Sequence, residues 1–307
     1  MEESIPIRLE KHTMQVVKKA VTPYSYLLPT LILIAILSLL PIVVVIRYSL
    51  LNNVVMTKNP VFVGLANYIT ILTDPVFHQA VINTLFFTIM SVIFHLIIGM
   101  AFATLLNAKV LSSFTKSIFR AVYILPWVFT ATIIAILWRL LLDPSGIINY
   151  FLTVVHIESI GNQIPWLGSI NLALPAVTFI NIWSGYPFYM VSLLAGLQGI
   201  PNELYEAATI DGAGSLQSFR YITIPQLRPI ILSIAMLDFV WTMQQFALIW
   251  MTTGGGPIHV TEMLSTYTYK LAFSSYQFSA ASTSAVIILI ISIFVVVFYV
   301  KNQKASV

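Results

Sequence analysis

The sequence predicts an all-α, polytopic membrane protein with six transmembrane helices and both termini in the cytoplasm. Composition is the first observation: of 307 residues, 58% are hydrophobic and only 8% are charged, whereas soluble domains are about 25% charged. The second observation is six apolar runs of about 20 residues, the length at which a helix crosses the hydrocarbon core. These runs are too long and too continuous for the strands of a membrane barrel.

The six runs define the expected domain organisation. They cover about residues 26–46, 84–106, 121–142, 172–197, 230–250 and 280–300. A transmembrane domain over 26–300 is then flanked by a cytoplasmic N-terminal segment, 1–25, and a cytoplasmic tail, 301–307. The N-terminal segment lacks the apolar core and cleavage site of a signal peptide, so we expect it to be retained. Interior prolines such as Pro126 and Pro187 are expected to kink the helices, which packed membrane helices tolerate.

The distribution of Lys and Arg predicts the orientation. Eleven of the 15 basic residues lie in the two terminal segments and in the connections after the second and fourth runs, and four lie on the other side. Basic residues accumulate on the cytoplasmic side, so the polar segment 201–226 is expected there. The opposite face carries the longer connections 51–80, 143–170 and 251–279, which read as ordered surface.

Several function classes are excluded by what the sequence lacks. It has no cysteine, which excludes disulfides and thiolate metal sites. It has no long basic block, so nucleic acid is not an expected partner. It has no P-loop motif, so the chain itself is not expected to bind ATP. No nucleophile–base or metal set is present, and we assign no catalytic residue, no metal site and no cofactor to this chain.

The segment 201–226 reads PNELYEAATIDGAGSLQSFRYITIPQ and has the pattern of a helix–turn–helix. Pro201 suits the first turn of a new helix, and Asn202 is a candidate cap. Glu206 lies early in that helix, where the helix dipole favours a carboxylate. Gly212 supplies a positive φ for the turn, and Ser215 is expected to cap a second short helix that runs to about residue 221.

The same segment resembles the cytoplasmic coupling loop of the permease subunits of ABC importers. The resemblance implies that this loop docks into a cleft of a cytoplasmic ATPase, with Glu206 pairing with a basic residue and Gly212 permitting the close turn. Small side chains at Ala207 and Ala208 would let the ATPase approach the backbone. The ATPase-coupling residues implied in this way are Glu206, Ala207, Ala208, Asp211, Gly212 and Pro225.

Further motifs extend the resemblance from residue 62 to about residue 285. They are Phe62–Tyr68, Asn83-Thr84-Leu85, Leu125-Pro126-Trp127, Gly146 with Asn149 and Leu152, and Thr252–Pro257 followed by Thr261 and Tyr267. Jointly they resemble the maltose/glycerol-phosphate/lactose type of binding-protein-dependent sugar permeases, in the subunit class of the larger maltose permease. The resemblance implies a type I ABC importer permease fold and a sugar substrate. It also implies a second homologous permease, two cytoplasmic ATPase subunits that bind ATP and Mg²⁺, and an extracytoplasmic solute-binding protein.

A substrate path is predicted from polar residues inside the apolar runs. Asp238 is the single acid deep within a run, and such costly residues are functional candidates by default. Thr242 and Gln245 share its helical face. Other runs contribute the remaining candidates, which are Trp127, Asn181, Gly185 and Tyr186. Carboxylates and amides next to flat aromatic rings commonly bind the hydroxyl groups of sugars. The motifs that resemble the maltose-type permease include these same positions.

Alternatives remain open at this point. Asn181, Thr242 and Gln245 could instead serve as interhelical hydrogen bonds of about 0.6 kcal/mol each, and we interpret His95 as a structural hydrogen-bonding residue. The chain could also be an ion-coupled secondary transporter or an ABC permease for a non-sugar solute. A secondary transporter should show paired intramembrane charges or inverted repeats, whereas the sequence has one buried acid and no evident repeat.

Overall fold

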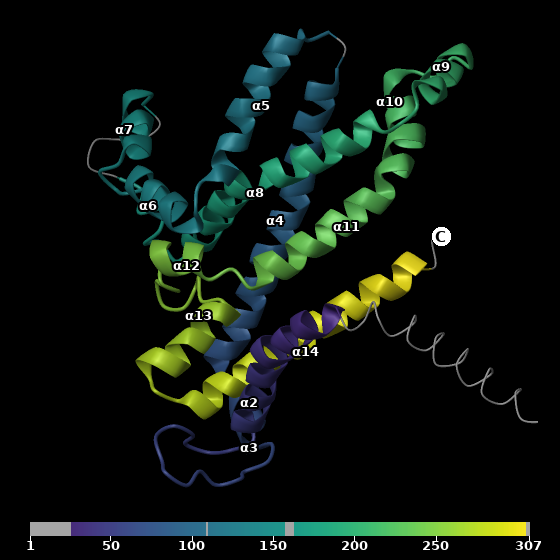
Figure 1. Ribbon diagram of the computed structural model, residues 1–307. Helices are drawn as coiled ribbons and strands as arrows, with labels where there is room; N and C mark the ends of the chain where they lie inside the picture. The colour runs from purple at the N-terminus through teal and green to yellow at the C-terminus, as the bar shows by residue number, and fades with distance from the viewer. Residues whose placement is uncertain (1–25, 109, 157–162, 305–307) are drawn as a thin grey trace, which may run out of the picture.

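The computed structural model describes residues 26–108, 110–156 and 163–304. Within these ranges the regular elements are all helices (Figure 1). One isolated antiparallel bridge joins Leu51 to Phe62. The elements in chain order are η1 (Ala35–Leu39), α2 (Leu40–Ser49), α3 (Ala66–Leu72), α4 (Pro75–Asn107), α5 (Ser113–Val128), α6 (Ala131–Leu141), α7 (Ile147–Val154), α8 (Ala173–Gln198), α9 (Asn202–Ile210), α10 (Ser215–Ser218), η2 (Phe219–Thr223), α11 (Ile224–Met243), α12 (Ala247–Thr252), α13 (Leu264–Tyr269), η3 (Lys270–Ser274) and α14 (Phe278–Lys304). The predicted segment 1–25 and residues 305–307 of the predicted tail lie outside the described residues.

Four helices within the described ranges are long and apolar enough to cross a membrane, and a bent pair of helices would make five. The four are Tyr26–Ser49, Pro75–Asn107, Ser215–Met243 and Phe278–Lys301. The predicted fourth run, 172–197, is present as α8, which continues through Pro187. It packs against α4, α5 and α11 and buries polar residues such as Asn181, so neighbouring helices rather than lipid surround much of it.

The predicted run over 121–142 is not one helix. Helix α5 ends at Val128, α6 begins at Ala131, and the two are bent by 95°. Pro126 in the last turn of α5 has no N–H to continue the helical ladder. Phe129 and Thr130 are extended, and the Thr130 hydroxyl accepts from the amide of Ile133 at 3.4 Å as the cap of the new helix.

The predicted run over 230–250 is also broken. Helix α11 ends at Met243 and α12 begins at Ala247. Neither Pro nor Gly lies at this break, so a distant contact explains it better than local propensity. The hydroxyl of Ser265 donates to the carbonyl of Gln245 at 2.7 Å, which gives that carbonyl a partner outside any helix.

Helices α4 and α8 form the most extensive packing of the fold and cross near its centre (Figure 1). Their close approach depends on Gly99 of α4, because a Cβ there would overlap the Cβ of Tyr189 on α8. Small residues at membrane-helix interfaces let backbones approach in this way. A buried cluster of Met100, Leu106, Tyr189, Leu193, Leu227 and their neighbours joins α4 and α8 to α11. This core holds three of the elements that build the site described below.

The 201–226 segment forms the expected helix–turn–helix, which extends to one end of the structure (Figure 1). Helix α9 ends in a Schellman motif: the amide of Ala213 donates to the carbonyl of Ala208 at 2.8 Å and that of Gly212 to Thr209 at 3.1 Å. Gly212 has φ +80°, a conformation in which glycine is favoured at a helix end. The turn therefore follows from the Asp-Gly pair, as predicted.

Three details of that prediction are wrong. The cap of α9 is Pro201, and Asn202 is its first helical residue. Ser215 is the first residue of the next helix and follows Gly214, whose amide donates to the Gln217 side chain at 2.8 Å. That helix does not end near residue 221 but passes through the π-helical turn η2 into α11, so that 215–243 is one continuous helix.

The connection after α12 contains a buried carboxylate that forms an ion pair with the partly exposed Lys270. Glu262 is fully buried, and its carboxylate accepts from Lys270 Nζ at 2.5 Å and from the hydroxyl of Thr266 at 2.7 Å. Gly255, with φ +91°, packs directly over this pair, since a Cβ there would lie 2.6 Å from the Glu262 carboxylate. Asn83 of α4 donates to the carbonyl of Glu262 at 3.0 Å. The glycine-rich turn 252–257 is thus held against α4 and α13.

Candidate functional site

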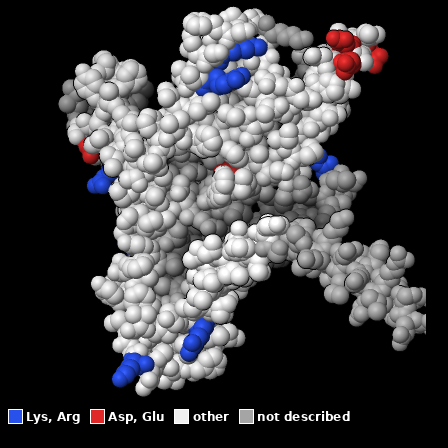
Figure 2. All heavy atoms as spheres, in the orientation of Figure 1, with Lys and Arg blue, Asp and Glu red and all other residues white. Residues whose placement is uncertain are grey.

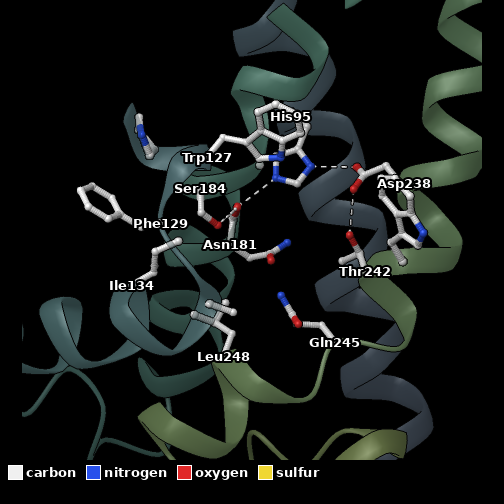
Figure 3. Close-up of a pocket in the computed structure, with 14 residues that line it drawn as sticks. His95, Trp127, Phe129, Ile134, Asn181, Ser184, Asp238, Thr242, Gln245 and Leu248 are labelled. Carbon is white, nitrogen blue, oxygen red and sulfur yellow. Dashed lines mark hydrogen bonds and ion pairs between the residues drawn. The ribbon is translucent and has the colours of Figure 1, made fainter. Parts of the chain in front are cut away.

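The main candidate site is an open pocket of about 300 Å³ between α4, α5, α6, α8, α11 and α12 (Figure 3). It lies beside both helix breaks described above, which let short segments of chain reach toward its centre. The lining residues are His95, Pro126, Trp127, Phe129, Ala131, Ile134, Asn181, Ser184, Gly185, Asp238, Trp241, Thr242, Gln245 and Leu248. Polar and aromatic side chains thus converge on one hollow from segments more than a hundred residues apart.

Asp238 is the centre of a hydrogen-bond network in this pocket. Its Oδ2 atom lies 2.8 Å from Nδ1 of His95 and accepts from the hydroxyl of Tyr189 at 3.0 Å. Its Oδ1 atom accepts from the hydroxyl of Thr242 at 3.0 Å. Asp238 is 8% exposed, so it is largely desolvated but retains access to the pocket. Two hydroxyl donors and the imidazole contact around this carboxyl group offset the cost of burying it.

His95 links the network to α8. Its Nε2 lies 3.0 Å from the carbonyl of Asn181, and the ring is almost fully buried. The ring packs directly against Gly185, where a Cβ would overlap its Nε2 and Cε1 atoms. Gly185 was predicted to line the substrate path, and packing explains why this residue is glycine: only glycine leaves room for the imidazole between α4 and α8.

Aromatic rings form the more exposed wall. Trp127 of α5 is 52% exposed and Trp241 of α11 is 58% exposed. Phe188 lies between them, with ring centroids 6.1 Å and 5.9 Å from the two indoles. Apolar side chains of Phe129, Ile134 and Leu248 complete the lining. A polar floor under flat aromatic rings can hold a molecule that has hydroxyls on its edge and C–H groups on its faces.

The structure brings six of the seven predicted path residues to this pocket: Trp127, Asn181, Gly185, Asp238, Thr242 and Gln245. Tyr186 lies elsewhere, because successive helical residues point about 100° apart. Its hydroxyl donates to the carbonyl of Tyr123 at 3.2 Å and its ring packs on Phe102. The amide nitrogen of Asn181 is engaged with Ser91 at 2.9 Å, so this side chain also joins α8 to α4.

Sequence reasoning did not include His95, Ser184 and Trp241 in the path. Trp241 could have been found, since it lies at i+3 from Asp238 on the same helix face. His95 was interpreted as a structural hydrogen-bonding residue, which describes its contacts correctly. Its partner, Asp238, lies 143 residues away, and nothing in the local sequence indicates that pairing.

The predicted coupling residues lie on the surface of the 201–226 helix–turn–helix, with Pro225 in the first turn of α11. Glu206, Ala207, Asp211, Gly212 and Pro225 are exposed, and Ala208 is partly exposed. Acidic side chains gather at this end of the molecule (Figure 2). Large apolar side chains are uncovered beside them: Ile210 is 86%, Leu216 79% and Tyr221 72% exposed. A surface that is both acidic and apolar is suited to a protein partner.

Comparison with known proteins places this arrangement in a family. Residues 95–305 match the family described as "Binding-protein-dependent transport system inner membrane component". The chain is 31% identical to the Probable ABC transporter permease protein YurN of Bacillus subtilis, over 93% of this chain and 97% of the relative. It is also 31% identical to the Trehalose/maltose transport system permease protein MalF of Thermococcus litoralis, over 94% and 95% of the two chains.

The fold has a close counterpart among solved structures. A chain of a bacterial ABC transporter involved in the import of the acidic polysaccharide alginate superposes with a TM-score of 0.83. That comparison covers 96% of this chain and 99% of the other at 23% sequence identity, so it bears on the fold alone. The family match and the relatives of similar length agree with the resemblance seen in the motifs. This chain belongs to the family of inner-membrane components of binding-protein-dependent transport systems, the permeases of ABC transporters.

Proposed function

We propose that this chain is the translocation subunit of an ATP-driven importer for a carbohydrate, and that the pocket around Asp238 contacts the sugar during passage. Family membership supports the transport role. The relatives named for trehalose, maltose and multiple sugars support the substrate class. The observation that carries the proposal is the pocket itself, where Asp238, Thr242 and Gln245 face Trp127 and its aromatic neighbours.

The chemistry of the pocket suits a polyhydroxylated solute. The Asp238 carboxylate and the Gln245 amide provide acceptors and a donor for hydroxyl groups. The indoles of Trp127 and Trp241 offer flat apolar faces to the C–H surface of a pyranose ring. A modest number of such contacts also lets the solute leave again, as transport through a pore requires.

The partners follow from the same proposal. A second, homologous permease completes the pore. Two cytoplasmic ATPase subunits bind ATP and Mg²⁺, and an extracytoplasmic binding protein delivers the sugar. This chain itself hydrolyses nothing. The 201–226 hairpin docks on an ATPase, and the continuous helix 215–243 carries the movement of the hairpin to Asp238 without an intervening loop.

Reconstitution in proteoliposomes tests this function. The chain is incorporated alone and together with its partner permease, ATPase and binding protein, and uptake of radiolabelled maltose and trehalose is measured with and without internal ATP. We expect uptake only in the complete assembly and only with ATP. ATP-dependent uptake of a non-sugar solute, with no sugar transported, would contradict the carbohydrate assignment and leave the importer assignment intact.

One observation favours a second candidate, ion-coupled transport. The His95–Asp238 contact is a pair of ionisable groups within membrane-embedded helices, a feature of proton-coupled carriers. Uptake by the chain alone, driven by a proton gradient and indifferent to ATP, would support that candidate and contradict the importer proposal.

A further inference from the structure

The ionisable groups of the pocket are limited to one hydrogen-bonded pair. Of the fourteen lining residues, Asp238 is the only acid, His95 is the only other titratable side chain, and neither Lys nor Arg is among them. Both members are largely buried, at 8% and 1% exposure. The charge that a solute meets in this pocket therefore depends on how this pair shares its protons.

Hydrogen-bond roles determine that sharing. The carbonyl of Asn181 can only accept, so Nε2 of His95 must carry a hydrogen. The 2.8 Å contact between Nδ1 of His95 and Oδ2 of Asp238 requires one further proton between these two atoms, because two lone pairs would repel. If that proton lies on Nδ1, the pair is imidazolium and carboxylate. If it lies on Oδ2, the pair is imidazole and carboxylic acid. Both arrangements have zero net charge.

The remaining contacts do not alter this balance. Tyr189 and Thr242 donate neutral hydroxyls to the two oxygens of Asp238. The contact between Ser184 and the Asn181 carbonyl, at 3.0 Å, is neutral as well. The pocket thus presents polar atoms without a net charge, and its lining residues offer no unpaired opposite charge to an incoming ion.

We infer that the His95–Asp238 pair makes the pocket select uncharged sugars over both uronic acids and amino sugars, with His95 acting as a positioning residue that balances Asp238. This inference rests on the carbohydrate function proposed above. A carboxylate on the sugar would face Asp238 with no Lys or Arg among the lining residues to receive it. An ammonium group would meet a carboxylate that His95 already compensates. Hydroxyl groups meet neither penalty.

A matched set of sugars tests the inference on the assembled permease–ATPase complex. The binding protein is left out, because its own selectivity would contribute to the measured preference. The probes are glucose, glucosamine and glucuronate, which share one ring and differ in charge, with maltose as a larger neutral probe. Binding is followed by tryptophan fluorescence, since Trp127 and Trp241 line the pocket. Wild-type protein should bind a neutral probe at least about tenfold more tightly than either charged one.

Three variants separate charge from packing. His95→Asn leaves Asp238 unbalanced and should shift the glucosamine-to-glucose affinity ratio at least about tenfold toward glucosamine. Asp238→Asn leaves His95 as the only ionisable side chain among the lining residues, so a carboxylate on the sugar can take the place of Asp238 as its partner, and the affinity for glucuronate relative to glucose should rise. The double variant carries no ionisable pair and should prefer the neutral sugar again, which a purely structural role of His95 does not predict. Size-exclusion chromatography of each complex checks assembly.

The outcomes are distinguishable. A wild-type protein that prefers glucosamine or glucuronate overturns the charge inference and leaves the carbohydrate function standing. Variants that weaken all probes equally, with unchanged ratios, overturn the role assigned to the pair. If wild-type protein binds none of these sugars and transports none in the reconstituted system, the carbohydrate function fails and the inference fails with it.

Discussion

The imidazole Nδ1 of His95 on α4 lies 2.8 Å from the carboxylate Oδ2 of Asp238 on α11. This contact joins two helices that also share a buried apolar core with α8, and it lies on the wall of the main pocket. The pair therefore has a packing role and a chemical role at once. Variants that move the ring without changing its charge, and variants elsewhere in the fold, separate these roles.

Gly185→Ala should displace His95 and impair transport. A Cβ at this position overlaps the imidazole, and overpacking of this kind costs about 1–3 kcal/mol. We expect a lower thermal midpoint and reduced uptake in the reconstituted complex. Gly168→Ala is the matched control, because its Cβ would meet its nearest atom at 3.6 Å. Equal stability and uptake in both variants would contradict the close approach of His95.

Glu206→Lys should uncouple uptake from ATP hydrolysis while the chain still inserts and folds. Glu206 is exposed on α9, so the reversal of its charge costs the isolated subunit little, but it opposes a basic residue on the proposed ATPase cleft. Co-purification with the ATPase and ATP-driven uptake are the measurements. Ser117→Lys, at an exposed position of α5, adds the same charge elsewhere and should leave both unchanged. Normal uptake in the Glu206 variant would argue against docking at this residue.

Gly212→Ala should weaken the hairpin through backbone strain alone. Gly212 has φ +80°, and no atom lies within 4 Å of the Cβ position, so the cost of about 1–2 kcal/mol comes from the left-handed conformation. Hydrogen exchange of residues 202–218 should increase. Gly214→Ala provides the comparison, since Gly214 has φ −73° and comparable free space. Similar exchange in the two variants would show that the Schellman turn does not depend on glycine.

Glu262→Ala should destabilise the fold. It removes a fully buried carboxylate that accepts from Lys270 and Thr266, and because the Lys270 side chain is 32% exposed and can turn to solvent, we expect a cost of about 1–3 kcal/mol. The double variant Glu262→Met with Lys270→Met should recover most of that loss, because apolar side chains of similar size replace both charges. The thermal midpoints of the wild type, of Glu262→Ala and of the double variant show whether the stability is recovered. A double variant less stable than Glu262→Ala would contradict this expectation, because it would show that Lys270 stabilises the fold without Glu262.

Much of the fold could be predicted because it depends on local chemistry. The apolar runs predicted for 84–106, 172–197 and 280–300 are present as α4, α8 and α14, although α4 begins nine residues earlier at Pro75. Asp74 explains that extension: its carboxylate accepts from the amide of Val76 at 2.8 Å and caps the helix. The kink expected at Pro126 is a bend of 95° between α5 and α6, and the break in the run over 230–250 was not anticipated, since an apolar run indicates burial but not continuity.

The part of the candidate site that could be predicted is the part that depends on the geometry of a single helix. Helical spacing placed Asp238 and Thr242 on one face, which is a property of a single helix. Adjacent positions such as Gly185 and Tyr186 were grouped together, although a helix directs them to different neighbours. Which of them faces the pocket depends on where α4 and α5 lie.

The sequence by itself determined the membrane character of the chain, the family it belongs to and the helix–turn–helix at 201–226, because run length, motif spacing and glycine conformation act over a few residues. Tertiary structure alone decided that His95 meets Asp238, and that the helix stops at Met243 so that Gln245 lines the pocket. Those outcomes require hydrogen bonds between segments far apart in the chain. Such bonds form only when packing of the apolar helices has already brought their donors and acceptors together.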